Sequence, residues 1–420
     1  MELKPGYKMT EVGVIPEDWK DAPLGGLAEI RMCKRIFSEQ TNSSGDIPFF
    51  KIGTFGRAPD AFISGDLYRE YKRKYSFPKK GDVLLSAAGT LGRTVVYDGG
   101  DAYFQDSNIV WLDIDHEKIT NEYLYQCYQT IRWASPEGST ISRLYNGIIR
   151  KTKIPLPPTE TEQTAIATAL SDVDELLATL DQVIAKKRDL KQAAMQQLLT
   201  GKIRLPGFGG EWEAKKLEHA GCCLRGVSYR GDDDLSPHDT AFTKRLLRSN
   251  NVQNAFVVTD DVQFVNNKRV SQDQVLQKND ILICMANGSK ALVGKAGLFS
   301  IDDGFDYTFG AFMGCFRTDA SIADPVFVFS LFQTGRYRDY INNLLAGSSI
   351  NNLSPSSIDS LEFSFPPYAE QVAIGRALAE MDAELSVLEY RRDKTHNLKQ
   401  AMMQELLTGK TRLVEGGYDG

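Results

Sequence analysis

Residues 190–205 read LKQAAMQQLLTGKIRL, and residues 398–413 read LKQAMMQELLTGKTRL. The two stretches are nearly identical and begin 208 residues apart. This period is far too long for a solenoid, in which repeats of about 20–50 residues stack on one another. The chain is therefore predicted to consist of two large half-units, each ending in the same helix.

The similarity continues upstream of these blocks. Glu162-Gln163 aligns with Glu370-Gln371, and prolines stand shortly before both pairs, where a helix can begin without losing a hydrogen bond. Both copies end on Thr-Gly-Lys, which places Gly201 and Gly409 as C-capping glycines. Start and stop signals together predict two complete helical segments, at residues 158–205 and 367–414.

Apolar residues in both segments recur at a spacing of three and four, which is typical of a coiled-coil seam. The seam positions are Leu170, Val173, Leu177, Leu180 and Ile184 in the first copy, and Leu378, Met381, Leu385 and Leu388 in the second. Two long helices with such seams can bury them against each other in antiparallel order. A linker helix packed on its own domain is the alternative, but it does not explain two near-copies.

The segments before the helices have short β-type runs broken by Gly, Asn and Asp. We therefore predict an α+β fold with two globular mixed α/β domains separated by two long antiparallel coiled-coil helices, related by a pseudo-twofold internal repeat. The predicted order is domain 1 at 1–157, spacer helix 1 at 158–205, domain 2 at 206–366, spacer helix 2 at 367–414 and a tail at 415–420.

The two globular segments share a faint common skeleton. Each has a buried-strand signature, at residues 81–85 and 279–283, followed by a loop rich in glycine and hydroxyl or amide residues, at 88–93 and 286–290. Aromatic-rich stretches further on, at 123–133 and 327–340, are typical of short buried helices. Because loops carry recognition while a scaffold positions them, divergent loops on one scaffold predict two different targets.

Composition indicates a soluble globular protein, with 42% hydrophobic and 25% charged residues and no apolar run long enough to span a bilayer. Six cysteines without a CxxC pair predict reduced thiols in the cytoplasm, and four scattered histidines predict no metal site. The net charge of −6 disfavours a free-standing nucleic-acid binder. The basic, tyrosine-containing residues 69–75 are nevertheless typical of a phosphate-contacting surface, or else of a solvated strand edge.

The sequence contains no recognisable catalytic constellation. The best phosphate-loop candidate, at residues 288–296, has five residues between its glycines and an alanine where Ser or Thr should bind magnesium. Asp98, Asp101 and Asp106 are acidic enough to suggest a nuclease, but turn-forming aspartates are the commoner explanation. A non-enzymatic role is therefore predicted.

Two variable domains, each followed by a helix that starts near Pro-Pro-x-x-Glu-Gln and ends in Leu-Leu-Thr-Gly-Lys-x-Arg-Leu, resemble the specificity subunit of type I restriction–modification enzymes. The opening Gly-Val-Ile-Pro-Glu-Asp-Trp at residues 13–19 is also similar to the start of this family. The resemblance covers essentially the whole chain. The alternative from another class is a coiled-coil scaffold for protein interactions, without a role in reading DNA.

The resemblance implies a non-catalytic, cytoplasmic subunit that reads the two halves of a split target in double-stranded DNA. It implies two methyltransferase (modification) subunits and restriction/translocase subunits as partners, and no membrane. The complex would be a DNA adenine methyltransferase and type I site-specific endonuclease. S-adenosylmethionine, ATP and Mg²⁺ would belong to the partner subunits, with no cofactor in this chain.

Candidate site residues follow from residue type and loop position. The candidate DNA-binding residues are Lys72, Arg73, Lys74, Lys79, Lys80, Arg93, Arg143 and Asn146 in the first domain, and Asn287, Lys290, Lys295, Asn351 and Asn352 in the second. The first five are expected on phosphates, and Arg93, Arg143 and Asn146 on base edges. The predicted subunit-interface residues are Glu162, Gln163, Leu190, Met195, Leu198, Glu370, Gln371, Leu398, Met403 and Leu406. Any of the DNA candidates could equally be surface turn chemistry.

Overall fold

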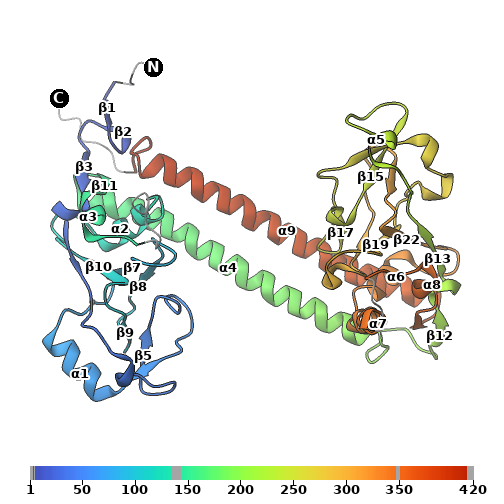
Figure 1. The fold of residues 1–420 in the computed structure, drawn as a ribbon, viewed down its shortest axis with the longest axis horizontal. Coiled ribbons are helices and arrows are strands. Elements are labelled where there is room, and N and C mark those ends of the chain that lie inside the picture. The colour runs from blue at the N-terminus through green and yellow to red at the C-terminus, as the bar shows by residue number, and fades with distance from the viewer. Residues whose placement is uncertain (1–2, 4, 134–142, 347–350, 414–420) are drawn as a thin grey trace. The chain divides into compact units, whose positions relative to one another are not determined.

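The computed structural model describes residues 3, 5–133, 143–346 and 351–413. The chain divides into two compact units: unit 1 is Met1–Asp181 with Tyr390–Gly420, and unit 2 is Gln182–Glu389 (Figure 1). Both are mixed α+β, as predicted. The predicted tail at 415–420 lies outside the described residues.

Two helices of 39 residues each, α4 (Glu160–Leu198) and α9 (Tyr368–Leu406), form the repeated part of the chain (Figure 1). Each is shorter than its predicted segment, because the glycine that closes it turns the chain immediately after the last leucine. Gly201 and Gly409 both have φ of +68°, and the backbone N–H of each donates to the carbonyl of that leucine, Leu198 or Leu406. The predicted glycine caps are confirmed.

We expect Gly409→Ala to destabilise its unit more than Gly201→Ala does. Left-handed backbone costs a residue with a Cβ about 1–2 kcal/mol at either position. At 409 the new Cβ would also lie 2.6 Å from Pro16 Cδ, whereas at 201 its nearest neighbour is the Trp212 ring at 3.4 Å. Hydrogen exchange of each unit's core amides measures the two losses, and equal losses would contradict the steric argument.

The predicted seam is the less exposed face of both long helices. Leu170, Leu180 and Ile184 on α4 are buried, as are Leu378 and Leu385 on α9. Ion pairs show that the helix segments run antiparallel within each unit. In unit 2 Lys187 pairs with Glu384 and Lys191 with Asp382, and in unit 1 Lys399 pairs with Asp174 and Arg392 with Asp181.

The core of unit 1 is a four-stranded antiparallel sheet in the order β4-β10-β7-β8. Its strands are β4 (Ala28–Arg31), β7 (Val83–Ser86), β8 (Thr94–Val96) and β10 (Ile109–Ile114). Successive side chains of a strand point to opposite faces of the sheet, so they pack into two hydrophobic clusters, one on each face. Val83 and Leu85 pack with helix α2 (Asn121–Tyr128) on one face, and Leu84 packs with Trp111 on the other.

Smaller elements complete unit 1 (Figure 1). The face of the sheet that carries Leu84 is covered by a three-stranded sheet and helix α1, and a strand pair leads into α4. These elements are β5 (Ile47–Phe50), β6 (Phe62–Ile63), β9 (Tyr103–Phe104), α1 (Gly65–Lys74), the pair β3 (Lys20–Pro23) and β11 (Lys153–Leu156), the hairpin β1 (Tyr7–Thr10) and β2 (Gly13–Pro16), and α3 (Asn146–Lys151).

Unit 2 repeats this plan with additions. Its main sheet has the order β13-β22-β19-β20-β17-β16, and a second sheet has the order β14-β18-β15-β21. The strands are β12 (Glu213–Lys216), β13 (Gly221–Arg225), β14 (Leu235–Ser236), β15 (Thr243–Leu247), β16 (Val252–Gln253), β17 (Phe256–Val257), β18 (Gln263–Asn266), β19 (Ile281–Cys284), β20 (Ala296–Leu298), β21 (Tyr307–Phe309), β22 (Met313–Thr318) and β23 (Glu362–Phe365). The helices are α5 (Gly231–Asp234), α6 (Pro325–Leu331), α7 (Gly335–Ala346) and α8 (Pro355–Asp359).

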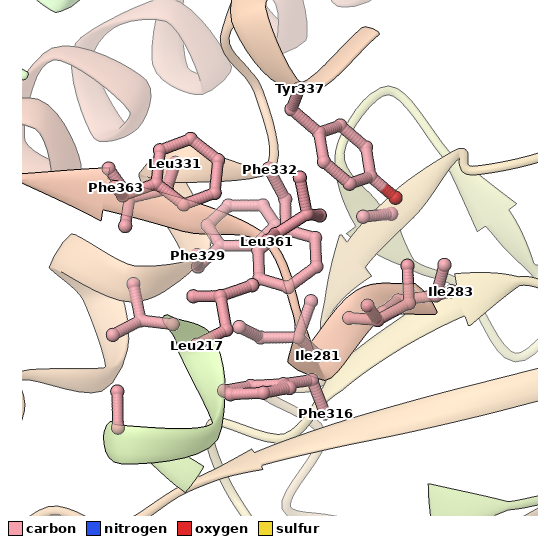
Figure 2. Close-up of a cluster of buried hydrophobic side chains, with 14 of the residues drawn as sticks. Leu217, Ile281, Ile283, Phe316, Phe329, Leu331, Phe332, Tyr337, Leu361 and Phe363 are labelled. Atoms are coloured by element: carbon pink, nitrogen blue, oxygen red, sulfur yellow. The ribbon is translucent and has the colours of Figure 1, made fainter. Parts of the chain in front are cut away.

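Figure 2 shows the largest hydrophobic cluster, which joins the main sheet of unit 2 to its helices. Ile281 and Ile283 of β19 and Phe316 of β22 meet Leu331 and Phe332 at the end of α6. The predicted buried strands are confirmed, since all four residues of β7 and of β19 are buried. The aromatic stretches that were predicted to form short buried helices do so, as α2 in unit 1 and as α6 and α7 in unit 2.

Candidate nucleic-acid interface

The polar loops predicted from the sequence meet a second segment at the same place in both units. In unit 1 the loop after β7 pairs with a residue 55 positions further on, through an antiparallel bridge between Ala88 and Arg143. In unit 2 the loop after β19 pairs with a residue 66 positions further on, through an antiparallel bridge between Ala286 and Asn352. Because β7 and β19 occupy equivalent sheet positions, the two loop pairs are equivalent sites. Each borders a cavity.

The unit 2 cavity has a volume of about 1090 Å³ and is lined by Ser228, Tyr229, Arg248, Ser249, Asn250, Asp261, Ala286, Asn287, Gly288, Gly310, Ala311, Phe312, Met313 and Asn351. Two of the predicted residues are among them. Asn287 Oδ1 accepts from the Ser289 backbone N–H at 2.9 Å, and Asn351 Nδ2 donates to the Gly288 carbonyl at 3.2 Å. Backbone contacts thus orient both amides.

An ion pair also forms part of the lining of the unit 2 cavity. Arg248 Nη2 lies 2.8 Å from Asp261 Oδ2, and Asn250 Nδ2 donates to the same carboxylate oxygen at 3.3 Å. Phe312, also on the cavity, is 72% exposed. Sequence reasoning missed these residues. The cationic run Lys244, Arg245 and Arg248 was a signal for the arginine, whereas nothing local marks Phe312.

The unit 1 cavity is smaller, at about 300 Å³, and is lined by Ile52, Gly53, Arg57, Ser86, Gly89, Thr90 and Arg93. Arg93 was predicted. Its Nη1 donates to the Phe55 carbonyl at 2.8 Å and its backbone N–H to Ser86 Oγ at 2.8 Å. Arg57, which sequence reasoning missed, is exposed, and no hydrogen bond or ion pair joins its guanidinium to another residue in the described part of the chain.

The predicted phosphate-binding cations of unit 1 lie away from this cavity. Lys72, Arg73 and Lys74 form the last turn of α1. Lys72 Nζ donates to the Tyr68 hydroxyl at 2.7 Å, and burial together with the hydrogen bond to Asp101 raises the pKa of Tyr68 to about 12, so this phenol stays neutral. Glu70 lies 2.7 Å from Lys74 and raises the pKa of that amine.

The remaining predicted DNA contacts lie outside the linings of the two cavities. Lys79 Nζ lies 3.7 Å from Asp113, and Lys80 is exposed. Arg143 Nη2 lies 3.5 Å from the Ser107 carbonyl, and Asn146 begins α3. In unit 2, Lys290 Nζ lies 3.4 Å from the carbonyl of Leu345, near the end of α7, while Lys295 and Asn352 are half-buried and exposed, respectively. None of these seven residues lines a cavity.

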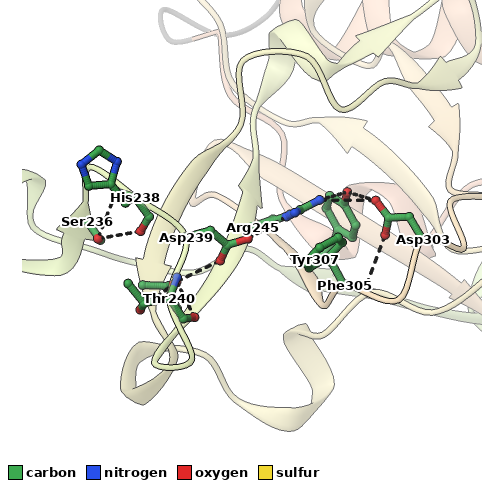
Figure 3. Close-up of polar contacts among 9 residues, drawn as sticks. Ser236, His238, Asp239, Thr240, Arg245, Asp303, Phe305 and Tyr307 are labelled. Carbon is green, nitrogen blue, oxygen red and sulfur yellow. Dashed lines mark hydrogen bonds and ion pairs between the residues drawn. The ribbon is translucent and has the colours of Figure 1, made fainter.

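A second polar cluster in unit 2 has a structural role (Figure 3). Arg245 Nε lies 3.0 Å from Asp239 Oδ2, its Nη1 donates to the Tyr307 hydroxyl at 3.0 Å, and its guanidinium carbon lies 3.3 Å from the centre of the Phe305 ring. Asp303 Oδ2 lies 3.3 Å from Nη1 of the same arginine. The charge of this arginine is thus satisfied within the unit, and it ties two loops together.

Most of the predicted subunit-interface residues are buried inside their own unit, and their role in an interface stays a prediction. Glu162, Gln163, Glu370 and Gln371 are buried, as are Met195, Leu198 and Leu406, while Met403 packs against the core of unit 1. The reason is that the end of each long helix forms part of the hydrophobic core of the unit it enters. Leu190 and Leu398 are the most exposed of the ten predicted residues, at 51% and 56%.

In each unit the buried glutamate near the start of one long helix pairs with an arginine that follows the end of the other long helix. Arg204 Nε and Nη2 donate to Glu370 at 2.5 Å, and Arg412 donates in the same way to Glu162. Each guanidinium also lies over a tryptophan ring, Trp212 at 5.5 Å or Trp19 at 5.8 Å. The carboxylates raise the pKa of both arginines, which stay charged. We call these two contacts the closing pairs.

Other chemistry finds little support in the described part of the chain. No group of three or more His, Cys, Asp or Glu side chains there could hold a metal ion, and none of the described helices is long and apolar enough to cross a membrane. The aspartates that suggested a nuclease are engaged locally. Asp101 accepts from Tyr68, Asp106 pairs with Arg35, and Asp98 caps the Gly100 backbone.

The two units share one sheet plan and are connected by two long helices whose final segments are nearly identical, while their cavities have unlike linings, so the fold is that of a chain with two similar domains. The model of the type I restriction modification DNA specificity domain matches residues 16–186 and again residues 211–394. The chain therefore belongs to this family, as the resemblance predicted.

Named relatives agree with this assignment. A Haemophilus influenzae protein named as a type I restriction enzyme specificity subunit is 55% identical over 162 residues, which are 39% of this chain and 42% of that protein. The EcoKI specificity subunit of Escherichia coli is 30% identical over 47% of this chain and 42% of its own. This chain thus spans less than half the length of these two relatives. The Methanocaldococcus jannaschii MjaX relative is 23% identical over 97% of both chains.

Solved structures share the fold. The S subunit of the type I restriction–modification system of M. genitalium matches with a TM-score of 0.62 at 14% identity, covering 96% of this chain and 99% of that one. A chain from a structure concerned with complex assembly and conformational transition of the type I system matches with a TM-score of 0.52 at 15% identity, over 94% and 99%. The predicted fold class is confirmed.

Proposed function

We propose that this chain is the non-catalytic DNA-specificity subunit of a type I restriction–modification complex. The observation that carries the proposal is the pair of equivalent loop sites, which have the same backbone framework but unlike linings. A framework that is repeated while its polar residues change suits two domains that read two different half-sites of one DNA target. A scaffold that only binds proteins gives no reason for two unlike polar cavities.

In this proposal the partner subunits supply the catalytic chemistry. Two methyltransferase subunits, which bind S-adenosylmethionine, would dock on the repeated helices, and restriction/translocase subunits using ATP and Mg²⁺ would join them. The net charge of −6 is consistent with DNA binding in such a complex, because the partners would add positive surface of their own.

The proposal is tested by exchanging residues 206–366 for the corresponding segment of a relative. The chain is combined with its methyltransferase partner, and the methylated sequence is mapped on random DNA. We expect one half of the target to change and the other half to stay as it was. Independent reading by the two units would be wrong if both halves changed, and no sequence-specific methylation by the unaltered complex would refute the function itself.

If Arg73 and Lys80 contact phosphates, the affinity of the complex for DNA should fall as the salt concentration rises. Arg73 and Lys80 are exposed, and neither forms an ion pair with another described residue. We expect Arg73→Gln with Lys80→Gln to lower the slope of log K against log salt concentration by about 0.9 for each lost phosphate contact. This slope is measured from the DNA affinity of the reconstituted complex at several salt concentrations. Lys20→Gln, on strand β3, is the control, and an equal effect there would exclude a local contact.

A further inference from the structure

We propose that the two cavities read different bases: the unit 2 cavity an adenine–thymine pair, and the unit 1 cavity a guanine. This inference rests on the proposed function and assigns chemistry to each half-site. In the major groove adenine offers an acceptor at N7 and a donor at N6, which an asparagine amide can meet with two hydrogen bonds. Guanine offers two acceptors, N7 and O6, which an arginine guanidinium meets with two donors.

The lining of the unit 2 cavity favours adenine. Its recognition groups are the amides of Asn250, Asn287 and Asn351, each of which combines a donor and an acceptor. The cation in the lining, Arg248, is engaged with both the carboxylate and the carbonyl of Asp261, at 2.8 and 2.9 Å. A guanidinium neutralised in this way is poorly placed to read the two acceptors of guanine.

The amide of Asn287 is the best placed of the three. Its Oδ1 accepts from the Ser289 backbone at 2.9 Å, which fixes its orientation and leaves a second lone pair on that oxygen. Its Nδ2 makes a long contact of 3.4 Å to Ser249 Oγ and a hydrogen bond to the Cys284 thiol, a weak acceptor, and a base acceptor can replace either of these partners. One acceptor and one donor in fixed orientation match N6 and N7 of adenine.

Phe312 supplies the apolar half of the same recognition. An aromatic side chain that is 72% exposed beside amides loses free energy by standing in water, and it regains this when apolar surface covers it. The C5-methyl group of thymine is the apolar feature of the major groove, and it lies on the partner base of adenine. An adenine–thymine pair therefore satisfies both the amide and the ring.

The lining of the unit 1 cavity favours guanine. It contains two arginines, Arg57 and Arg93, and neither an acidic nor an amide side chain. Arg93 is held by the Phe55 carbonyl at 2.8 Å, so part of its donor set is used. Arg57 is exposed and its guanidinium donors are unengaged within the described residues, which leaves it free for the bidentate contact.

The test uses the full chain assembled with its methyltransferase partner and maps the methylated sequence on random DNA. The exchange of residues 206–366 shows which half-site unit 2 reads. We expect an adenine–thymine pair in that half and a guanine in the other. Asn287→Asp replaces the donor by a second acceptor, so it should shift one position of the unit 2 half-site from adenine toward cytosine, whose N4 amino group donates.

Matched control variants distinguish a loss of base recognition from a general loss of folding or assembly. Arg57→Gln should relax a guanine in the unit 1 half-site and leave the other half unchanged. The controls are Asn343→Asp, an exposed asparagine of α7 outside the unit 2 cavity, and Arg69→Gln, which lies on α1 and pairs with Asp66. Neither control should alter the target.

A measurement on the unaltered protein covers the case in which a variant fails to fold. Duplexes carrying 7-deazaadenine in the unit 2 half-site, or 7-deazaguanine in the unit 1 half-site, lack the N7 acceptor, and each should bind about ten-fold more weakly. The base assignment is overturned if the unit 2 half-site contains no adenine–thymine pair besides the methylated adenine, if the unit 1 half-site contains no guanine, or if either deaza duplex binds like normal DNA. In that event the proposed function still stands. Absence of any defined sequence would instead refute the proposed function.

Discussion

Replacing Arg412 by methionine should destabilise unit 1 by about 3–5 kcal/mol, one of the two largest effects that we expect from a single substitution in this chain. Glu162 is fully buried, and both of its carboxylate oxygens accept from the Arg412 guanidinium. Asp18 holds the same guanidinium at 3.0 and 3.1 Å. Methionine removes the charge while keeping an unbranched side chain, so a carboxylate would be left buried without a partner.

The second closing pair provides an internal comparison. Arg204→Met should act in the same way on unit 2, through the fully buried Glu370, and each variant should act on its own unit. Hydrogen exchange of the core strands β7 and β19 reports on the two units separately. In the double variant Arg412→Met with Glu162→Leu, most of the loss should be recovered, because replacing both charges by apolar groups is often nearly neutral. Unchanged protection in unit 1 of the single variant would contradict the importance of the pair.

Much of the architecture was predictable because its signals are local. The glycines that end the long helices, the prolines before them and the spacing of the seam residues all act within a few turns of helix, so they can be read without knowing what the helix touches. Gly201 and Gly409 are clear instances, since both adopt the left-handed backbone that only glycine enters at low cost. The seam residues Leu180 and Ile184 are likewise buried as their spacing predicts.

The candidate site was only partly predictable, because a cavity depends on residues that are distant in sequence. Asn287 could be found because a polar loop directly follows a buried strand. Arg57 could not, because it comes from a different loop and reaches the cavity only through the tertiary fold. Phe312 carries no local signal either, since a lone phenylalanine in a sequence is most often a core residue and only the structure shows this one exposed.

The contacts that the repeated block makes within each unit could not be predicted from the sequence for a related reason. Near-identity of two segments indicates that both meet the same surroundings, but it does not indicate whether those surroundings are a partner protein or the chain itself. Here they are largely internal. Leu406 packs in the core of unit 1 and Leu198 in the core of unit 2, each against strands that precede a long helix.

The second large effect is expected for Leu406→Ala. Leu406 is 4% exposed and belongs to the main cluster of unit 1, so truncation should remove buried apolar surface and leave a cavity, at a cost of about 2–5 kcal/mol. Leu398 is the matched control. It has the same side chain, lies two turns earlier on α9, and is 56% exposed. Leu398→Ala should change the stability of unit 1 by no more than about 0.5 kcal/mol.

Assembly should show the opposite order, and this distinguishes the inner from the outer face of the same block. If the methyltransferase partner docks on the exposed side of the repeated helices, Leu398→Ala and its counterpart Leu190→Ala should weaken assembly while both units remain fully folded. Leu406→Ala should weaken assembly only as far as it unfolds unit 1. Urea denaturation followed by hydrogen exchange gives the stability of each variant, and titration with the partner gives its affinity. A stable Leu406→Ala variant that had lost its partner would show that the buried leucine serves the interface after all, because a residue that only fills the core cannot act on a partner without first disturbing that core.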